Sequence, residues 1–196
     1  MSWLSTALTV LAVGAATRYS VSVSAKASLV LAQPVVFAAM LVLGTGSAVW
    51  ITALGVALGY LWQGRKWYNA LFNAADWALS LGLAGLFYRT LAPAGPPMLS
   101  PTSLIVIAIS WLIFFTINST LVCTLVALHR GQNFAEHWLA IIRRAAREEL
   151  AFLVLALLMT LAAQQYAWIV VLLVIIGFIA CSSGLRLLLL SRSAAR

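Results

Sequence analysis

The chain has 196 residues, of which 64% are hydrophobic and only 8% are charged, against about 45–50% and 25% in soluble globular domains. Its 12 basic and 4 acidic side chains are too few to cover the surface of a soluble protein of this size. The apolar runs are long and unbroken, which excludes a membrane β-barrel, whose strands alternate apolar and polar residues. The composition therefore predicts an all-α, polytopic membrane helix bundle that forms a single domain over residues 1–196.

Seven apolar segments are expected to cross the membrane, and six is the alternative count. Several of them are shorter than the roughly 20 residues that a perpendicular helix needs, but local thinning of the bilayer accommodates short spans. In chain order the segments are residues 2–17, 27–43, 47–62, 68–91, 102–128, 150–163 and 166–190.

Two local patterns interrupt the early part of this series. Residues 19–25 alternate with period two, which predicts a short extended stretch. In the second segment, Pro34 follows Gln33 and predicts a kink in the helix. The backbone carbonyl that loses its hydrogen-bond donor at the proline is then expected to find a partner inside the bundle. Three tryptophans lie deep within segments and are expected to pack in the core: Trp50, Trp77 and Trp111.

An amphipathic helix is expected over about residues 133–147, between the fifth and sixth segments. Its apolar residues recur at helical spacing, and most of its charged residues lie elsewhere around the helix. Such a helix is expected to lie on the cytoplasmic interface and to turn arginines toward anionic lipid headgroups. The arginines are Arg143, Arg144 and Arg147.

Most of the basic residues are predicted to lie on one side of the membrane. With the N-terminus outside, the inside loops and the C-terminal tail hold 11 of the 12 basic residues, and the outside loops hold none. The positive-inside rule then places the C-terminus in the cytoplasm, in a multi-pass protein of a bacterial cytoplasmic (inner) membrane. This topology accounts for the net charge of +8, so we expect no nucleic-acid partner.

The fourth segment carries a polar stripe. Asn69, Asn73, Asp76 and Ser80 are spaced by four, three and four residues and therefore share one helix face. Asp76 is the only acidic residue inside a predicted span, and an ionisable group at membrane depth faces the bundle interior or a watery cavity. One interpretation is a ligand-binding or proton-sensitive site. The other is that Asp76 pairs with the basic residues at the nearby cytoplasmic end or with interfacial water.

Asn118 lies near the middle of the fifth segment. It either meets the polar stripe and completes the site, or it joins helices by a hydrogen bond without further function. The candidate ligand-binding set is therefore Asn69, Asn73, Asp76 and Asn118. In the third segment, Gly55 and Gly59 form a GxxxG motif, which lets another helix approach closely, either within the bundle or from a second copy.

No catalytic, cofactor or metal site is expected. No lysine lies inside a predicted span, which excludes a retinal Schiff base, and His129 and His137 lie at the cytoplasmic edge, where they do not form a haem site. No phosphate loop, zinc-ligand cluster or nucleophile–base pair is present. The pair Glu148 and Glu149 adjoins two arginines and is expected to form a salt-bridged helix start. We therefore expect a protein that is not an enzyme.

Three sequence runs carry a resemblance to a known group of proteins. Residues 65–75 read RKWYNALFNAA, residues 79–89 read LSLGLAGLFYR, and residues 114–120 read FFTINST. Together with the surrounding apolar segments they resemble the integral-membrane N-terminal region of bacterial signalling proteins that carry HD-GYP phosphohydrolase or diguanylate cyclase domains. The resemblance implies a sensor-type or scaffold role. Only six residues follow the last long apolar stretch here, so a catalytic domain is not expected.

Three functions remain open. The first is a non-catalytic sensor or scaffold that relays a signal to a protein partner through its cytoplasmic loops. The second is a substrate-binding membrane subunit of an energy-coupling-type importer for vitamins or metals. The third is an accessory subunit of a larger membrane complex.

Overall fold

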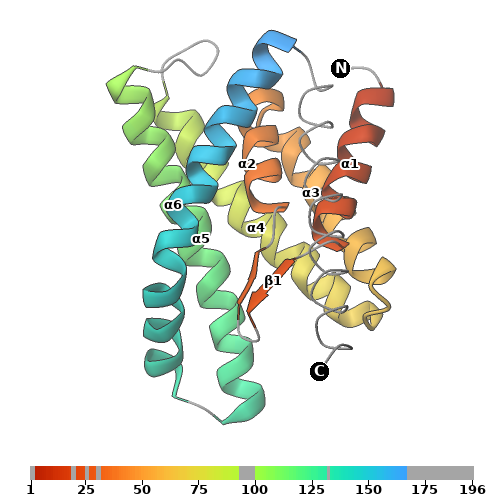
Figure 1. Cartoon of the computed structure of the whole chain (residues 1–196), viewed down its shortest axis with the longest axis vertical. Coiled ribbons are helices and arrows are strands. Elements are labelled where there is room, and N and C mark those ends of the chain that lie inside the picture. The colour runs from red at the N-terminus through yellow and green to blue at the C-terminus, as the bar shows by residue number, and fades with distance from the viewer. Residues whose placement is uncertain are drawn as a thin grey trace, which may run out of the picture.

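The computed structural model describes residues 3–18, 21–24, 27–29, 32–92, 100–131 and 133–166. In these ranges the chain forms six α-helices and a short two-stranded antiparallel ribbon (Figure 1), and the prediction of an all-α bundle is confirmed apart from that ribbon. The predicted seventh segment lies outside the described residues except for its first residue. The elements are α1 (Trp3–Arg18), β1 (Val21–Ser24), β2 (Ala27–Leu29), α2 (Ala32–Leu43), α3 (Thr45–Trp62), α4 (Trp67–Leu91), α5 (Pro101–Arg130) and α6 (Phe134–Tyr166).

Among the described residues, four helical stretches are long and apolar enough to cross a membrane: Thr45–Trp62, Trp67–Leu91, Pro101–Arg130 and Glu148–Gln165. Two shorter apolar helices accompany them, Thr6–Arg18 and Ala32–Leu43. Many leucines on the outer faces of α3, α4 and α5 are exposed. A lipid environment removes the cost that water would impose on such a surface.

The start of the predicted second segment is wrong. Its first three residues form β2, which pairs with β1 so that Val21 lies opposite Leu29, and α2 begins only at Ala32. The extended stretch predicted just before it is confirmed as β1. Pro34 lies in the first turn of α2, where its missing N–H has no intrahelical acceptor to lose. The proline therefore fits the beginning of the helix, and the predicted kink is absent.

The short helix α2 is the centre of the bundle (Figure 1). It packs against α1, α3, α4 and α6, and its residues from Pro34 to Leu41 are all buried. A helix that is apolar all round requires this position. Phe37 of α2 is fully buried and contacts Trp111 and Phe114 of α5, with ring centroids 4.8 Å and 6.3 Å away.

The tryptophan predictions hold for two of the three residues. Trp77 and Trp111 are buried, whereas Trp50 is 72% exposed. The buried face of α3 includes Ala48, Ile51 and Gly55, and Trp50 falls on the other side of the helix. Depth along a segment does not determine which way a side chain faces, which is why the prediction for Trp50 is wrong.

A tight turn connects α3 to α4. Gly64 has φ +74°, the left-handed conformation that favours glycine. Its N–H donates to the carbonyl of Leu61 at 2.9 Å, and the N–H of Arg65 donates to that of Tyr60 at 3.1 Å. These two bonds form a Schellman motif, which satisfies the last carbonyls of α3 and reverses the chain into α4.

Helices α1 and α3 run in the same direction and are in close contact. Gly59 of α3 faces Gly14 and Thr17 of α1, and Gly55 faces Val13. At the end of the pair, the Gln63 side-chain amide donates to the carbonyl of Thr17 at 2.7 Å. In this structure the GxxxG motif therefore serves packing within the chain.

The predicted amphipathic helix is the first half of α6 and is not a separate element. Residues 134–147 continue directly into the span, because no Gly or Pro interrupts the helix between Phe134 and Tyr166. The first half contacts α5, since Trp138 Nε1 donates to Thr120 Oγ1 at 3.2 Å. Arg143 is exposed, and the side chains of Arg144 and Arg147 lie outside the described ones. The contact with anionic lipids stays a prediction.

Candidate ligand-binding cavity

Asp76 connects α4 to α5 inside the bundle. The residue is 3% exposed, and its Oδ2 accepts a hydrogen bond from Asn118 Nδ2 at 3.0 Å. Its Oδ1 lies 3.4 Å from the donating hydroxyl of Ser80. The structure thus brings the polar stripe of the fourth segment to Asn118, and Asp76 pairs with these two residues rather than with Arg65 or Lys66.

The other two members of the predicted set line different cavities. Asn73 lines a cavity together with Asn118, and its side chain donates to the carbonyl of Asn69 at 2.7 Å. The Asn69 side chain lines a second cavity of about 450 Å³ with His129 and Arg130. Its position is one helical turn, about 6 Å, nearer the start of α4. A role of Asn69 in ligand binding stays a prediction.

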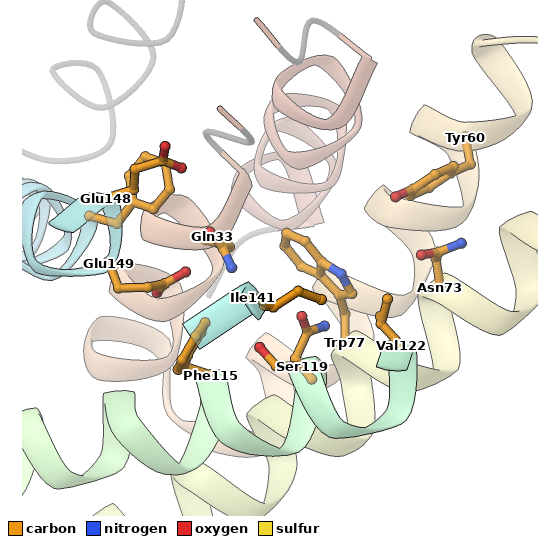
Figure 2. Close-up of a pocket in the computed structure, with 12 residues that line it drawn as sticks. Gln33, Tyr60, Asn73, Trp77, Phe115, Ser119, Val122, Ile141, Glu148 and Glu149 are labelled. Carbon is orange, nitrogen blue, oxygen red and sulfur yellow. The ribbon is translucent and has the colours of Figure 1, made fainter. Parts of the chain in front are cut away.

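The first cavity has a volume of about 310 Å³ and lies among α2, α3, α4, α5 and α6 (Figure 2). This volume is at the lower end of the range of roughly 300–1,000 Å³ for ligand pockets. The polar residues that line it are Gln33, Asn73, Asn118, Ser119, Glu148 and Glu149. Its aromatic lining consists of Tyr60, Trp77, Phe115 and Phe152.

Glu149 is a site residue that the sequence analysis missed. Its Oε2 accepts a hydrogen bond from Trp111 Nε1 at 3.0 Å, and its carboxylate also interacts with the side-chain amide of Gln33. In Figure 2 the Glu149 carboxylate points toward Gln33, whereas the carboxylate of Glu148 points away from Gln33. Asp76 is consequently not the only acidic residue that bonds to another helix, because Glu149 accepts a hydrogen bond from Trp111 of α5.

The expectation of a salt-bridged pair stays a prediction for both glutamates, and the structure adds two described hydrogen bonds of Glu149. Its partners are an indole N–H and an amide from two other helices. Its closest basic neighbours in sequence, Arg144 and Arg147, have side chains outside the described ones. A signal for this role existed in the sequence, since the two glutamates lead without a helix breaker into an apolar run.

Asp76 fixes the orientation of the Asn118 amide. A carboxylate only accepts hydrogen bonds, so the Asn118 NH₂ group must face Asp76 and its Oδ1 is left as an acceptor. Because Asn118 lines the cavity, Asp76 acts as a positioning residue behind the cavity wall. The buried aromatic residues support the same wall, with Trp77 edge-on to Phe114 at 6.0 Å between ring centroids.

The lining of the cavity resembles that of a small-molecule site. In the described parts of the chain, no group of three or more His, Cys, Asp or Glu side chains is placed to hold a metal ion. The cavity instead combines one inward carboxylate, several amides and aromatic rings. Convergent polar groups in an otherwise apolar pocket are typical of small-molecule sites.

The family model MASE9 matches residues 4–185, which is nearly the whole chain. The chain belongs to the MASE9 family. This family comprises membrane-associated sensor domains, so the expectation of a membrane sensor region is confirmed at that level. No curated protein and no solved structure matches the chain.

The contact between Asp76 and Asn118 is expected to stabilise this MASE9 domain measurably. Replacing Asp76 by leucine leaves the half-buried Asn118 amide without its acceptor, and we expect the free energy of unfolding to fall by about 1–3 kcal/mol. The N118L change leaves the buried Asp76 carboxylate without its closer donor and is expected to cost at least as much, and the double variant less than the sum, with a coupling energy of about 1 kcal/mol. Unfolding by sodium dodecyl sulfate in mixed micelles, followed by circular dichroism, measures all three.

The matched control is N69L on the same helix face. Asn69 is exposed and its backbone carbonyl remains available to Asn73, so a change within about 0.5 kcal/mol is expected. Additive costs of the Asp76 and Asn118 changes would contradict the assigned contact.

Proposed function

We propose that this MASE9 domain senses a small ligand in the cavity among α2–α6 and relays its occupancy to a cytoplasmic signalling protein. The observation that carries the proposal is the role of α6 in the cavity wall. Ile141, Glu148, Glu149 and Phe152 all belong to α6. A bound molecule therefore contacts the same continuous helix that leads to the α5–α6 turn.

The start of α6 is suited to transmit a change in the occupancy of the cavity. It is tied to α5 near the turn by the bond from Trp138 to Thr120, while Ile141 lines the cavity about one turn further along. A ligand that alters the spacing of α5 and α6 at the cavity shifts the exposed side chains at the start of α6. A rigid helix transmits such a shift without a change in secondary structure.

The charged residues support a cytoplasmic position for the end of the bundle at which α6 begins. The α3–α4 and α5–α6 turns lie at the same end, opposite the last turn of α4 and the first turn of α5 (Figure 1). The positive-inside rule then directs this end to the cytoplasm and the N-terminus outward, in a bacterial inner membrane. The described basic residues near this end are Arg18, Arg65, Lys66, Arg130 and Arg143.

The partner that we propose is an enzyme of the HD-GYP phosphohydrolase or diguanylate cyclase class. The resemblance to the membrane region of such signalling proteins supports this choice, and MASE9 membership supports a sensor rather than an importer subunit or an accessory subunit. In this arrangement the MASE9 domain itself is not catalytic. Its output is a change in the contact that the start of α6 makes with the enzyme.

Photo-crosslinking in native membranes tests the relay. A photoreactive amino acid in place of Leu139, an exposed residue in the first half of α6, is expected to capture a protein with an HD-GYP or diguanylate cyclase domain. The matched control is Leu86, an exposed leucine near the opposite end of α4, which is expected to capture no such enzyme. Capture of a transport ATPase at Leu139, or of the same enzyme at both positions, would overturn the proposal.

A further inference from the structure

We propose that the cavity binds a small organic ammonium ion, with Glu149 as its counter-ion. This inference rests on the proposed function, because it names the chemical class of ligand for the same site. Three features of the cavity carry it: the charge of its lining, its hydrogen-bond acceptors and its aromatic surface.

Among the described side chains, no cation in the lining balances the charge of Glu149. Glu149 lies at the start of a membrane-spanning stretch, and its hydrogen-bond partners Trp111 and Gln33 are neutral donors. None of the described residues that line the cavity is basic. A carboxylate at membrane depth is costly unless it is paired, and a cationic ligand supplies the missing partner.

The remaining polar groups present acceptors to the cavity. Because one N–H of Asn118 is engaged by Asp76, its amide is held so that the carbonyl oxygen is available to a ligand. The hydroxyl oxygens of Tyr60 and Ser119 add two further acceptors. A primary ammonium has three donors and no acceptor, so these oxygens and the Glu149 carboxylate can accept all of its hydrogen bonds.

The aromatic lining distinguishes an organic cation from a metal ion. Trp77 lies centrally in the cavity wall, and the Tyr60 hydroxyl points toward it (Figure 2). Aromatic faces attract ammonium groups by cation–π interaction within about 6 Å of the ring centroid. Val122 and Ile141 give an apolar surface for the carbon skeleton of the ligand. A metal ion gains nothing from these apolar and aromatic groups.

The test compares two probes of the same size and shape on the purified full chain in mild detergent at pH 7. The probes are 2-phenylethylamine, which is protonated at this pH, and 2-phenylethanol, which is neutral. The amine at 10 mM is expected to raise the Tm by about 3 °C, and the alcohol is expected to leave it unchanged. Equal shifts with both probes, no shift with the amine, or the same rise with 10 mM NaCl would overturn the proposal without any variant.

Two variants of α6 then locate the counter-ion. E149Q keeps an oxygen acceptor for Trp111, so it is expected to fold while raising the Kd for the amine at least tenfold. E136Q makes the same charge change in the first turn of α6, at an exposed residue that does not line the cavity, and is expected to bind the amine as the wild type does. Equal losses in both variants would contradict the role of Glu149.

The outcome of the amine-binding test can be distinguished from the outcome of the crosslinking test of the relay. Failure of the amine to stabilise the wild type, with the Leu139 crosslink intact, would reject the ligand class and leave the relay standing. Loss of the crosslink with the amine shift intact would reject the relay and leave the binding site standing.

Discussion

Replacing Trp111 by alanine is expected to lower the free energy of unfolding by about 3 kcal/mol, the lower end of the range for such aromatic truncations. Trp111 is 4% exposed, and its ring is edge-on to Phe37 and Phe114 with centroids 4.8 Å and 5.9 Å away. The lower end applies because lipid rather than water surrounds the bundle, so little hydrophobic transfer free energy is lost. The cost is mainly the loss of packing contacts to the aromatic rings.

A W111F variant separates packing from hydrogen bonding. The phenyl ring retains much of the contact with Phe37, but the N–H donor to Glu149 is lost, so a smaller cost of about 1–2 kcal/mol is expected. Unfolding in mixed detergent micelles measures both variants. The control is W50A on the lipid-facing side of α3, which is expected to change the free energy by less than about 0.5 kcal/mol. A loss for W50A as large as that for W111A would contradict the central role of the aromatic cluster.

Most of the helical segments could be predicted because each is a long apolar run with polar or glycine-rich ends. The predicted segments 47–62, 68–91 and 102–128 differ from α3, α4 and α5 by only a few residues at either end. Residues 27–29 were assigned to a helix, because a short apolar run fits a helix as well as it fits a strand. Pairing with β1 decides that local structure, and this contact has no signature within the run itself.

The candidate site was predictable where helix periodicity sufficed. The spacing on α4 correctly places Asp76 and Ser80 on one face, and the polar centre of α5 correctly suggests Asn118 as a partner. Periodicity gives the face but not the depth of a residue, which is why it does not reveal that Asn69 lines a different cavity from Asn73. Glu149 was missed because its sequence neighbours are arginines, whereas its actual partners come from α2 and α5.

Replacing Gly59 by leucine is expected to lower the free energy of unfolding by about 1–3 kcal/mol, the usual cost of overpacking. Even a Cβ atom at this position would lie 2.6 Å from Thr17 Cβ and 2.7 Å from the carbonyl oxygen of Gly14. The second contact is with backbone and cannot be relieved by a rotamer change. Helix α1 must therefore move away from α3, which also weakens the bond from Gln63 to the Thr17 carbonyl.

The control for this variant is G82A in α4, where a Cβ would meet Val49 Cγ2 at an ordinary 3.5 Å. Alanine is the better helix former by about 1 kcal/mol, so G82A is expected to be neutral or stabilising. Unfolding in mixed micelles is measured together with the oligomeric state from light scattering. Because α1 of the same chain covers Gly55 and Gly59, the Gly59 change is expected to alter stability and not the oligomeric state. A dimer that dissociates in the variant without loss of stability would instead assign the motif to contact between two copies.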